Sequence, residues 1–233
     1  MELNRNPILY YGIKWSREFY EKKLNNPAYL DLDKYFPEHT KLAERWEEIR
    51  DEALDVMNHF HVPEFHDVDK GQGFISNNDG RKWQICVLKL YDAWVEPNID
   101  KCPKIYELLK DMPHVTTINL SYLEPGKHIP EHRGPYKGIY RYQLPLTVPK
   151  NGKCRIYVNG EPHYWKEGQG VLFDDTFPHE VKNESDEYRL ALLLDVKRQD
   201  MPANLRWLDK MMYQIIKTGI YMNGAVKKAQ IAA

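Results

Sequence analysis

The second half of the chain, from about residue 116 to residue 196, is a succession of short apolar or alternating runs separated by turn signals. The runs are Thr117–Leu123, Arg141–Val148, Cys154–Val158, Glu161–Trp165, Gly170–Phe173, His179–Val181 and Tyr188–Val196. Among the turn signals, Asn159-Gly160 is typical of a two-residue hairpin. Many short strands at this spacing indicate an antiparallel sandwich or barrel, so we expect a mainly β fold with flanking helices.

The rest of the chain predicts helices around that core. Apolar residues recur at helical spacing from about residue 40 to residue 57, and a short helix is expected at 103–112. The stretch 59–80 is rich in Asp, Gly, Asn and His and is expected to be a loop, whereas 83–94 is expected to form one or two strands. We expect one domain overall, with three parts. These are a helical or mixed region (1–115), a strand-rich core (116–200) and a C-terminal helical extension (201–233).

Composition narrows the class of protein. Of 233 residues, 42% are apolar and 29% are charged, and the formal net charge is −1. These values predict a globular protein and argue against a nucleic-acid binder that depends on bulk positive charge. The three cysteines, Cys86, Cys102 and Cys154, form no CxxC pair, so we expect reduced thiols. The N-terminus lacks a signal-peptide core and no apolar run reaches spanning length, so we expect a cytoplasmic protein.

Two histidines and one arginine carry the chemistry of the strand-rich half. His132 and His179 belong to separate expected strands, and Arg189 lies in an apolar run beyond the second histidine. Imidazole suits Fe(II), and a planar, permanently charged guanidinium is the best partner for the distal carboxylate of 2-oxoglutarate. An arginine in so apolar a strand is costly to bury unless it holds an anion. The pattern therefore predicts a non-haem iron site that uses this cosubstrate, although two separated histidines alone are more often structural.

Several other residues have two interpretations. Asp174 and Asp175 either orient a histidine ligand or cap a turn. His128 and Glu131 are expected in solvated loop positions, and the histidine-rich segment 59–66 has a spacing too mixed to make a strong second metal site. Three aromatic residues are expected in the core, with the alternative that one lines a substrate channel: Trp83, Tyr91 and Trp94.

The residues around the two histidines form longer motifs. They are His132-Arg133-Gly134-Pro135, Arg141-Tyr142-Gln143-Leu144 and the run from Phe173 to Val181, with Ser121 before them and Arg189 after them. Over roughly residues 36–200 the chain resembles the aspartyl/asparaginyl β-hydroxylase family. That family contains Fe(II)- and 2-oxoglutarate-dependent dioxygenases with a double-stranded β-helix fold, which is jelly-roll or cupin-like.

The resemblance implies a role for each matching residue. His132 and His179 match the iron ligands, and Arg189 matches the arginine that holds the distal carboxylate of 2-oxoglutarate, with O2 as the oxidant. Ser121 and Arg141 match positions that assist cosubstrate binding. Gln143 stands where the animal aspartyl hydroxylase has a histidine, and a glutamine can still donate a hydrogen bond to a carboxylate.

Gly134 divides the family. Sites of this kind usually carry a carboxylate ligand two positions after the first histidine. The bacterial lipid A hydroxylase branch has an aspartate there, and the animal peptide hydroxylases have a glycine. Three interpretations follow for this chain: water fills the third position and the enzyme hydroxylates, chloride fills it and the enzyme halogenates, or iron binding is lost. Retention of both histidines and Arg189 argues against the third.

The clues to the substrate point in two directions. The segments 83–92 and 144–149 and an apolar, basic helix expected at 203–220 resemble the lipid A branch. We therefore expect hydroxylation of a lipid acyl chain, with an Asp or Asn side chain of a peptide or protein as the alternative suggested by Gly134. A free amino acid hydroxylase and a non-enzymatic cupin-like binding module are further alternatives. The C-terminal helix either packs on the domain or makes peripheral contact with a membrane, and the sequence makes no prediction of oligomeric state.

Overall fold

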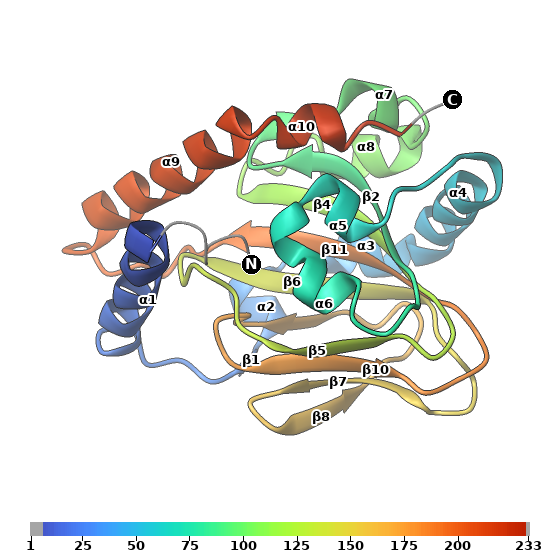
Figure 1. Cartoon of the computed structure of the whole chain (residues 1–233), viewed down its shortest axis with the longest axis horizontal. Coiled ribbons are helices and arrows are strands. Elements are labelled where there is room, and N and C mark those ends of the chain that lie inside the picture. Colours follow the sequence, from blue (N-terminus) through green and yellow to red (C-terminus); the bar gives the residue numbers. More distant parts are fainter. Residues whose placement is uncertain (1–6, 232–233) are drawn as a thin grey trace.

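The computed structural model describes residues 7–231, within which two antiparallel sheets pack face to face (Figure 1). The larger sheet has the strand order β1-β9-β6-β11-β4-β2-β3, and the smaller sheet has the order β5-β10-β7-β8. The strands of the larger sheet are β1 (Tyr29–Leu30), β2 (Trp83–Leu90), β3 (Ala93–Trp94), β4 (Val115–Leu123), β6 (Ile139–Thr147), β9 (Val171–Phe173) and β11 (Arg189–Lys197). Those of the smaller sheet are β5 (His128–His132), β7 (Cys154–Val158), β8 (Glu161–Tyr164) and β10 (His179–Asn183).

The connections between strands make this arrangement a jelly roll. From β4 onward the chain passes back and forth between the sheets, so that β4-β11-β6-β9 faces β5-β10-β7-β8. This is the double-stranded β-helix predicted from the sequence, and the prediction is confirmed. β1, β2 and β3, which precede residue 116, extend the larger sheet at its two edges. The division of the chain at residues 116 and 201 stays a prediction.

The predicted strands match the observed ones closely. The hairpin between β7 and β8 turns at Asn159-Gly160, and both residues have positive φ (54° and 79°), as the expected turn requires. Two strands departed from the prediction: β1 had no predicted counterpart, and β5 was expected only at His132. The segment that carries His128 and Glu131 was expected to be loop, but it forms β5 and pairs with β10. The prediction failed there because this short strand, which contains Pro130, lacks a simple alternating pattern.

Helices cover the larger sheet and its ends. They are α1 (Pro7–Glu21), α2 (Leu32–Tyr35), α3 (His39–Glu44), α4 (Trp46–His59), α5 (Phe65–Val68), the 3₁₀ turn η2 (Lys70–Gln72), α6 (Gly73–Ser76), α7 (Glu96–Ile99), α8 (Pro103–Leu109), α9 (Arg206–Met222) and α10 (Ala225–Lys228). The helix expected at 40–57 is divided at Arg45. The loop prediction for 59–80 was wrong, since α5, η2 and α6 lie there. Single helical turns are too short to show a periodic pattern.

Alternation along β11 separates the two cores. Leu190, Leu192 and Leu194 are buried with α4 residues such as Ile49 in the core between the larger sheet and the helices. Successive side chains on a strand point to opposite faces, so Arg189 must point the other way, toward the smaller sheet. The second core, between the sheets, contains residues of both, including Ile85, Ile129, Ile156, Phe173 and Val181.

Asn98 fastens the C-terminal segment to the larger sheet. This buried side chain donates from Nδ2 to the carbonyl oxygens of Val87 (2.7 Å) and Ala229 (2.8 Å). Its Oδ1 accepts a hydrogen bond from the backbone N–H of Ile231 at 2.9 Å. The amide therefore links α7, β2 and the segment after α10 through three hydrogen bonds.

We expect the substitution Asn98→Ala to lower the free energy of unfolding by about 2–3 kcal/mol, because it leaves buried backbone groups without partners. Urea denaturation followed by circular dichroism measures this change. Asn223→Ala, at an exposed position after α9, is the control and should change stability by no more than about 0.5 kcal/mol. Equal free energies of unfolding for the two variants would show that the three hydrogen bonds of Asn98 do not contribute to stability.

Candidate metal and cosubstrate site

His132 and His179 are direct cross-strand partners on β5 and β10. Val181 pairs with Ile129, so β5 has one more residue than β10 between these two pairs. Because of this β-bulge, the His132 side chain lies on the same face of the smaller sheet as the His179 side chain. The imidazole ring centroids are 4.1 Å apart. The strand pairing thus brings together two histidines that are 47 positions apart in sequence.

Each imidazole is held by a backbone carbonyl. The Nδ1 atom of His132 lies 2.9 Å from the oxygen of Pro130, and that of His179 lies 3.0 Å from the oxygen of Phe177. A carbonyl oxygen only accepts hydrogen bonds, so Nδ1 is the protonated nitrogen of each ring and Nε2 keeps a free lone pair. This is the arrangement in which a histidine binds a metal ion, with the second nitrogen fixing the ring.

The electrostatic surroundings keep both rings neutral. Burial, with a smaller contribution from the nearby Arg141 guanidinium, lowers the pKa of His132 to about 4. Burial also places the pKa of His179 well below its ordinary value, and His132 and Arg141 contribute in the same direction. Neutral imidazole is the form that binds metal, so both rings are ready to act as ligands at neutral pH.

A carboxylate occupies the space beside Gly134. A Cβ atom built at Gly134 would overlap the carboxyl group of Asp175, and the N–H of Gly134 donates to the backbone oxygen of Asp175 at 2.7 Å. Asp175 is buried, and within residues 7–231 its Oδ1 has no hydrogen-bond partner. Burial raises its pKa to about 7, although Arg141 opposes the shift. A side chain at position 134 and the present position of Asp175 are therefore mutually exclusive.

The two adjacent aspartates have different tasks. Asp174 caps its own turn, because its Oδ1 accepts from the N–H (3.0 Å) and the hydroxyl (2.6 Å) of Thr176. Its Oδ2 accepts from the buried ammonium of Lys137 at 2.6 Å. Asp175 instead lies against Gly134 and 3.3 Å from the guanidinium of Arg141. The turn-capping interpretation is therefore confirmed for Asp174, whereas an orienting role of Asp175 toward a histidine stays a prediction.

Arg189 is a buried cation that lacks a protein counter-ion. Its side chain donates to Ser121 Oγ (3.2 Å) and Gln143 Oε1 (3.3 Å), and its guanidinium lies 4.3 Å from the Trp165 ring centroid. Its Nε has no partner, and no carboxylate in residues 7–231 forms an ion pair with it. The residue is 2% exposed, and burial lowers its pKa to about 10. A guanidinium in this environment requires an anion.

The residues predicted around Arg189 are brought together by strand pairing. Ser121 on β4 pairs with Ala191, and Gln143 on β6 pairs with Leu193, so both share the inward face of Arg189. Two tryptophans also contact this group of residues. The Trp83 indole donates to Ser121 Oγ at 3.0 Å, and Trp165 stacks on Arg189. Trp165 was not predicted, because nothing in its local sequence distinguishes it from a core residue.

Arg141 lies between the two groups of residues. Its Nε donates to Asp195 at 2.7 Å, and a terminal nitrogen lies 3.3 Å from Asp175. It also acts on the pKa values of both histidines. The structure therefore places Arg141 beside the histidine pair, with carboxylates of its own chain as partners.

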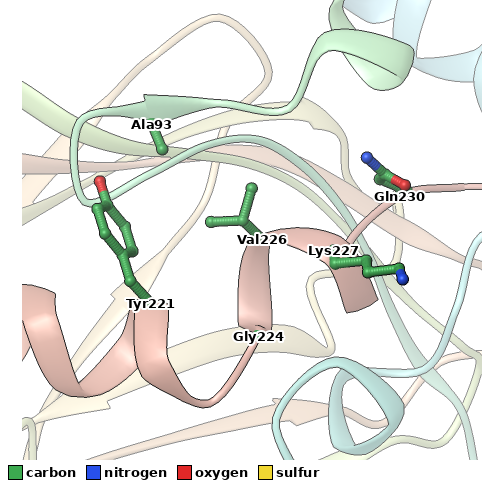
Figure 2. A pocket seen from close by; sticks show the side chains of 6 residues that line it. All are labelled: Ala93, Tyr221, Gly224, Val226, Lys227 and Gln230. Atoms are coloured by element: carbon green, nitrogen blue, oxygen red, sulfur yellow. The ribbon is translucent and has the colours of Figure 1, made fainter.

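Other sequence candidates lie elsewhere. His66 contacts Ser76 Oγ at 3.1 Å, His59 contacts Asp55, and His128 contacts Glu180 at 3.0 Å. Within residues 7–231 no three His, Cys, Asp or Glu side chains form a metal-binding group. His59 and His66 therefore have partners away from the histidine pair, and the weak second-site interpretation of segment 59–66 stays untested. A surface groove of about 340 Å³ beside α10 contains none of the candidate residues (Figure 2).

Comparison with known proteins identifies the family. Residues 43–199 match the sequence profile described as Aspartyl/Asparaginyl beta-hydroxylase. The chain belongs to this family. It is 35% identical over 184 residues to the ornithine lipid ester-linked acyl 2-hydroxylase of Rhizobium tropici, with 78% of this chain and 64% of that protein covered. The match therefore spans slightly less than two thirds of that relative.

Two further proteins extend the comparison. The chain is 29% identical over 210 residues to the aspartyl/asparaginyl beta-hydroxylase of Homo sapiens, with 84% of this chain and 26% of that protein covered. Among solved structures, a Pseudomonas putida prolyl-4-hydroxylase aligns with a TM-score of 0.47 and 15% identity, over 69% of this chain and 90% of that one. In residues 7–231, no helix has the length and apolar character needed to cross a membrane.

We expect His132→Ala and His179→Ala each to weaken Fe(II) binding by at least about 100-fold, because even the outer partners of metal ligands contribute 10- to 100-fold. Anaerobic titration calorimetry measures the affinity. His128→Ala is the matched control, since this histidine lies on the same strand and contacts Glu180 instead. Iron binding that survives in either ligand variant would remove that histidine from the site.

Gly134→Asp alone should lower the melting temperature without strengthening iron binding, because the new side chain overlaps Asp175. The double variant Gly134→Asp with Asp175→Gly has room for a carboxylate ligand. It should bind Fe(II) at least about tenfold more tightly than Asp175→Gly alone. Thermal unfolding and anaerobic titration test the two parts. A stable Gly134→Asp protein with tight iron binding would contradict the mutual exclusion of the two side chains.

Proposed function

We propose that the protein is a Fe(II)- and 2-oxoglutarate-dependent dioxygenase that hydroxylates an unactivated C–H bond in the acyl chain of a lipid. One observation carries the proposal. Arg189 is a buried cation without a carboxylate partner in residues 7–231, and it shares the interior between the sheets with two neutral histidines. A metal ligand pair and an anion-binding arginine in one interior fit a metal-bound dicarboxylate.

The donor set fits the metal and the cosubstrate. Two neutral imidazoles are suitable Fe(II) ligands, and a site with few protein ligands leaves positions for small molecules. When bound, Fe(II) with 2-oxoglutarate and O2 supplies the oxidant for C–H hydroxylation and leaves succinate and CO2. His132 and His179 hold the metal. Arg189 binds the distal carboxylate, and Ser121 and Gln143 orient the guanidinium and contribute to this pocket.

Asp175 and Arg141 prepare the side of the site next to Gly134. The unpaired Asp175 oxygen can accept a hydrogen bond from a water molecule in the position where related sites carry a protein carboxylate. Arg141 holds Asp175 and is itself held by Asp195. Because Asp175 offers a water molecule a hydrogen-bond partner there, we favour hydroxylation with water over halogenation with chloride. Retention of the complete arginine pocket disfavours a pseudoenzyme.

The lipid acyl chain is the substrate class that the relatives and the sequence favour together. The Rhizobium relative is named for an acyl 2-hydroxylase activity on a lipid and matches 78% of this chain. The C-terminal extension is apolar and basic, as an enzyme that meets lipids in a bilayer requires. We therefore expect peripheral contact with a membrane. An Asp or Asn side chain of a peptide or protein is the second candidate, because the human relative carries that name.

We expect the purified protein with Fe(II), 2-oxoglutarate and O2 to form succinate and to add one oxygen atom to an ester-linked acyl lipid. Arg189→Met should raise the KM for 2-oxoglutarate at least about 100-fold, because a lost buried charge pair costs about 3 kcal/mol. Mass spectrometry of the products and succinate assays provide the measurements.

Arg155→Met is the control, since this arginine pairs with Glu184 near the surface of β7, and it should leave the KM unchanged. An added oxygen on an aspartate-containing peptide, with none on the lipid, would replace the lipid with the second candidate. A chlorine in place of the oxygen would make the protein a halogenase. Unchanged cosubstrate use by Arg189→Met would remove Arg189 from the site.

A further inference from the structure

One side of α9 exposes a stripe of large apolar residues. Trp207, Met211 and Ile215 follow one another at four-residue intervals, and Met222 continues the stripe two turns later. Their side chains are 67%, 44%, 51% and 82% exposed. Residues four apart lie on the same side of a helix, so these four form one continuous apolar surface.

An adjacent side of α9 packs on the domain, and Leu208, Met212 and Ile216 are partly buried there. Leu205, Leu208, Met212 and Ile216 pack in a cluster with Tyr136 and with α1 residues. This cluster holds the helix on the domain, and the residues of the exposed apolar stripe take no part in it. An exposed, continuous apolar surface of this kind marks an interaction site.

The charges of the C-terminal extension are segregated from those of the rest of the chain. Residues 203–233 contain Arg206, Lys210, Lys217, Lys227 and Lys228 but one acid, Asp209, so their side chains sum to +4 (5 − 1). The whole chain has a net charge of −1, which leaves −5 for the remainder (−1 − 4).

The exposed charges beside the stripe are all positive in the described part of the extension. Asp209 is half-buried and bonded to Tyr136, whereas Arg206, Lys210, Lys227 and Lys228 are exposed. Figure 2 shows Lys227 next to Val226 at the groove beyond the end of α9. An apolar stripe bordered by cations is complementary to a surface with an apolar interior and anionic headgroups.

α9 is also connected to the candidate active site. The Tyr136 hydroxyl donates to Asp209 Oδ1 at 2.5 Å, and Tyr136 follows His132 by four residues on the loop that contains Gly134. On the other side, the ring of Tyr213 lies 5.8 Å from that of Tyr91. Tyr136 therefore links the packed side of α9 to the loop that follows His132.

We propose that the exposed face of α9 docks on a lipid bilayer that contains anionic lipids, with Trp207, Met211, Ile215 and Met222 among the acyl chains and the basic residues at the headgroups. The proposal rests on the lipid substrate proposed above and deepens it by naming the surface that reaches the lipid. Charge argues against a second copy of this chain as the occupant, because a two-fold interface would set two such basic faces against each other.

Vesicle partitioning of the full chain tests the proposal. We expect the protein to bind vesicles that contain phosphatidylglycerol and phosphatidylcholine, and to bind phosphatidylcholine vesicles much more weakly, with binding that decreases as salt increases. The double variant Trp207→Ser with Met211→Ser should partition at least about tenfold less. Arg206→Glu with Lys210→Glu should partition at least about twentyfold less onto the anionic vesicles, because each basic side chain at such a surface contributes several-fold.

Two matched variants control for general surface effects. Tyr164→Ser with Tyr188→Ser removes apolar residues that are 55% and 41% exposed outside α9. Lys150→Glu with Lys153→Glu reverses two exposed charges in the turn between β6 and β7. Both controls should partition like the natural sequence, and circular dichroism verifies that all variants are folded.

Three outcomes would overturn the proposal: absence of vesicle binding, equal binding by the α9 variants and their controls, or a dimer in light scattering that Trp207→Ser with Met211→Ser abolishes. The assay needs no iron or cosubstrate, so it is independent of the catalytic proposal. Vesicle binding without lipid hydroxylation would leave the docking surface and overturn the catalytic proposal. Hydroxylation of detergent-solubilised lipid without vesicle binding would support the catalytic proposal and overturn the docking surface.

Discussion

The inward position of Arg189 is the constraint on which the rest of the site depends. β11 runs through the middle of the larger sheet, and Leu190, Leu192 and Leu194 must face the helices for the core to form. Alternation then forces the first residue of the strand into the space between the sheets. The strands on either side supply Ser121 and Gln143 at the same depth, because their registers with β11 are set by the same packing. The inward, buried position of the Arg189 guanidinium thus follows from the packing of the apolar residues on the other face of β11.

The smaller sheet places the imidazole rings of His132 and His179 next to each other. Pairing of β5 with β10 makes His132 and His179 neighbours, but only the extra residue in β5 turns both rings to the same side. The loop after His132 then needs glycine, because the Asp175 carboxylate already fills the adjoining space. The space beside position 134 is accordingly occupied by the carboxyl group of Asp175, which lies beside Arg141.

Sequence patterns predicted the parts of this architecture that repeat locally. The alternating runs and the Asn159-Gly160 turn located most strands, and the motifs around His132 and His179 indicated the site. The bulge in β5 was not predictable, since an inserted residue leaves no hydrophobic signature and Pro130 is the sole hint. The stacking of Trp165 on Arg189 joins residues from separate strand connections, which local patterns do not reveal. Single-turn helices between residues 59 and 80 were missed for lack of periodicity.

The hydrogen bonds of Asn98 have a consequence for how the molecule approaches its surroundings. They pin the chain just after α10, while Tyr136 and the Leu205 cluster pin it at the start of α9. The segment that contains α9 and α10 is therefore fixed to the domain at its start and just after its end. Its outer face keeps one orientation relative to the two sheets, so any plane on which it rests meets the histidine pair at a constant height and angle.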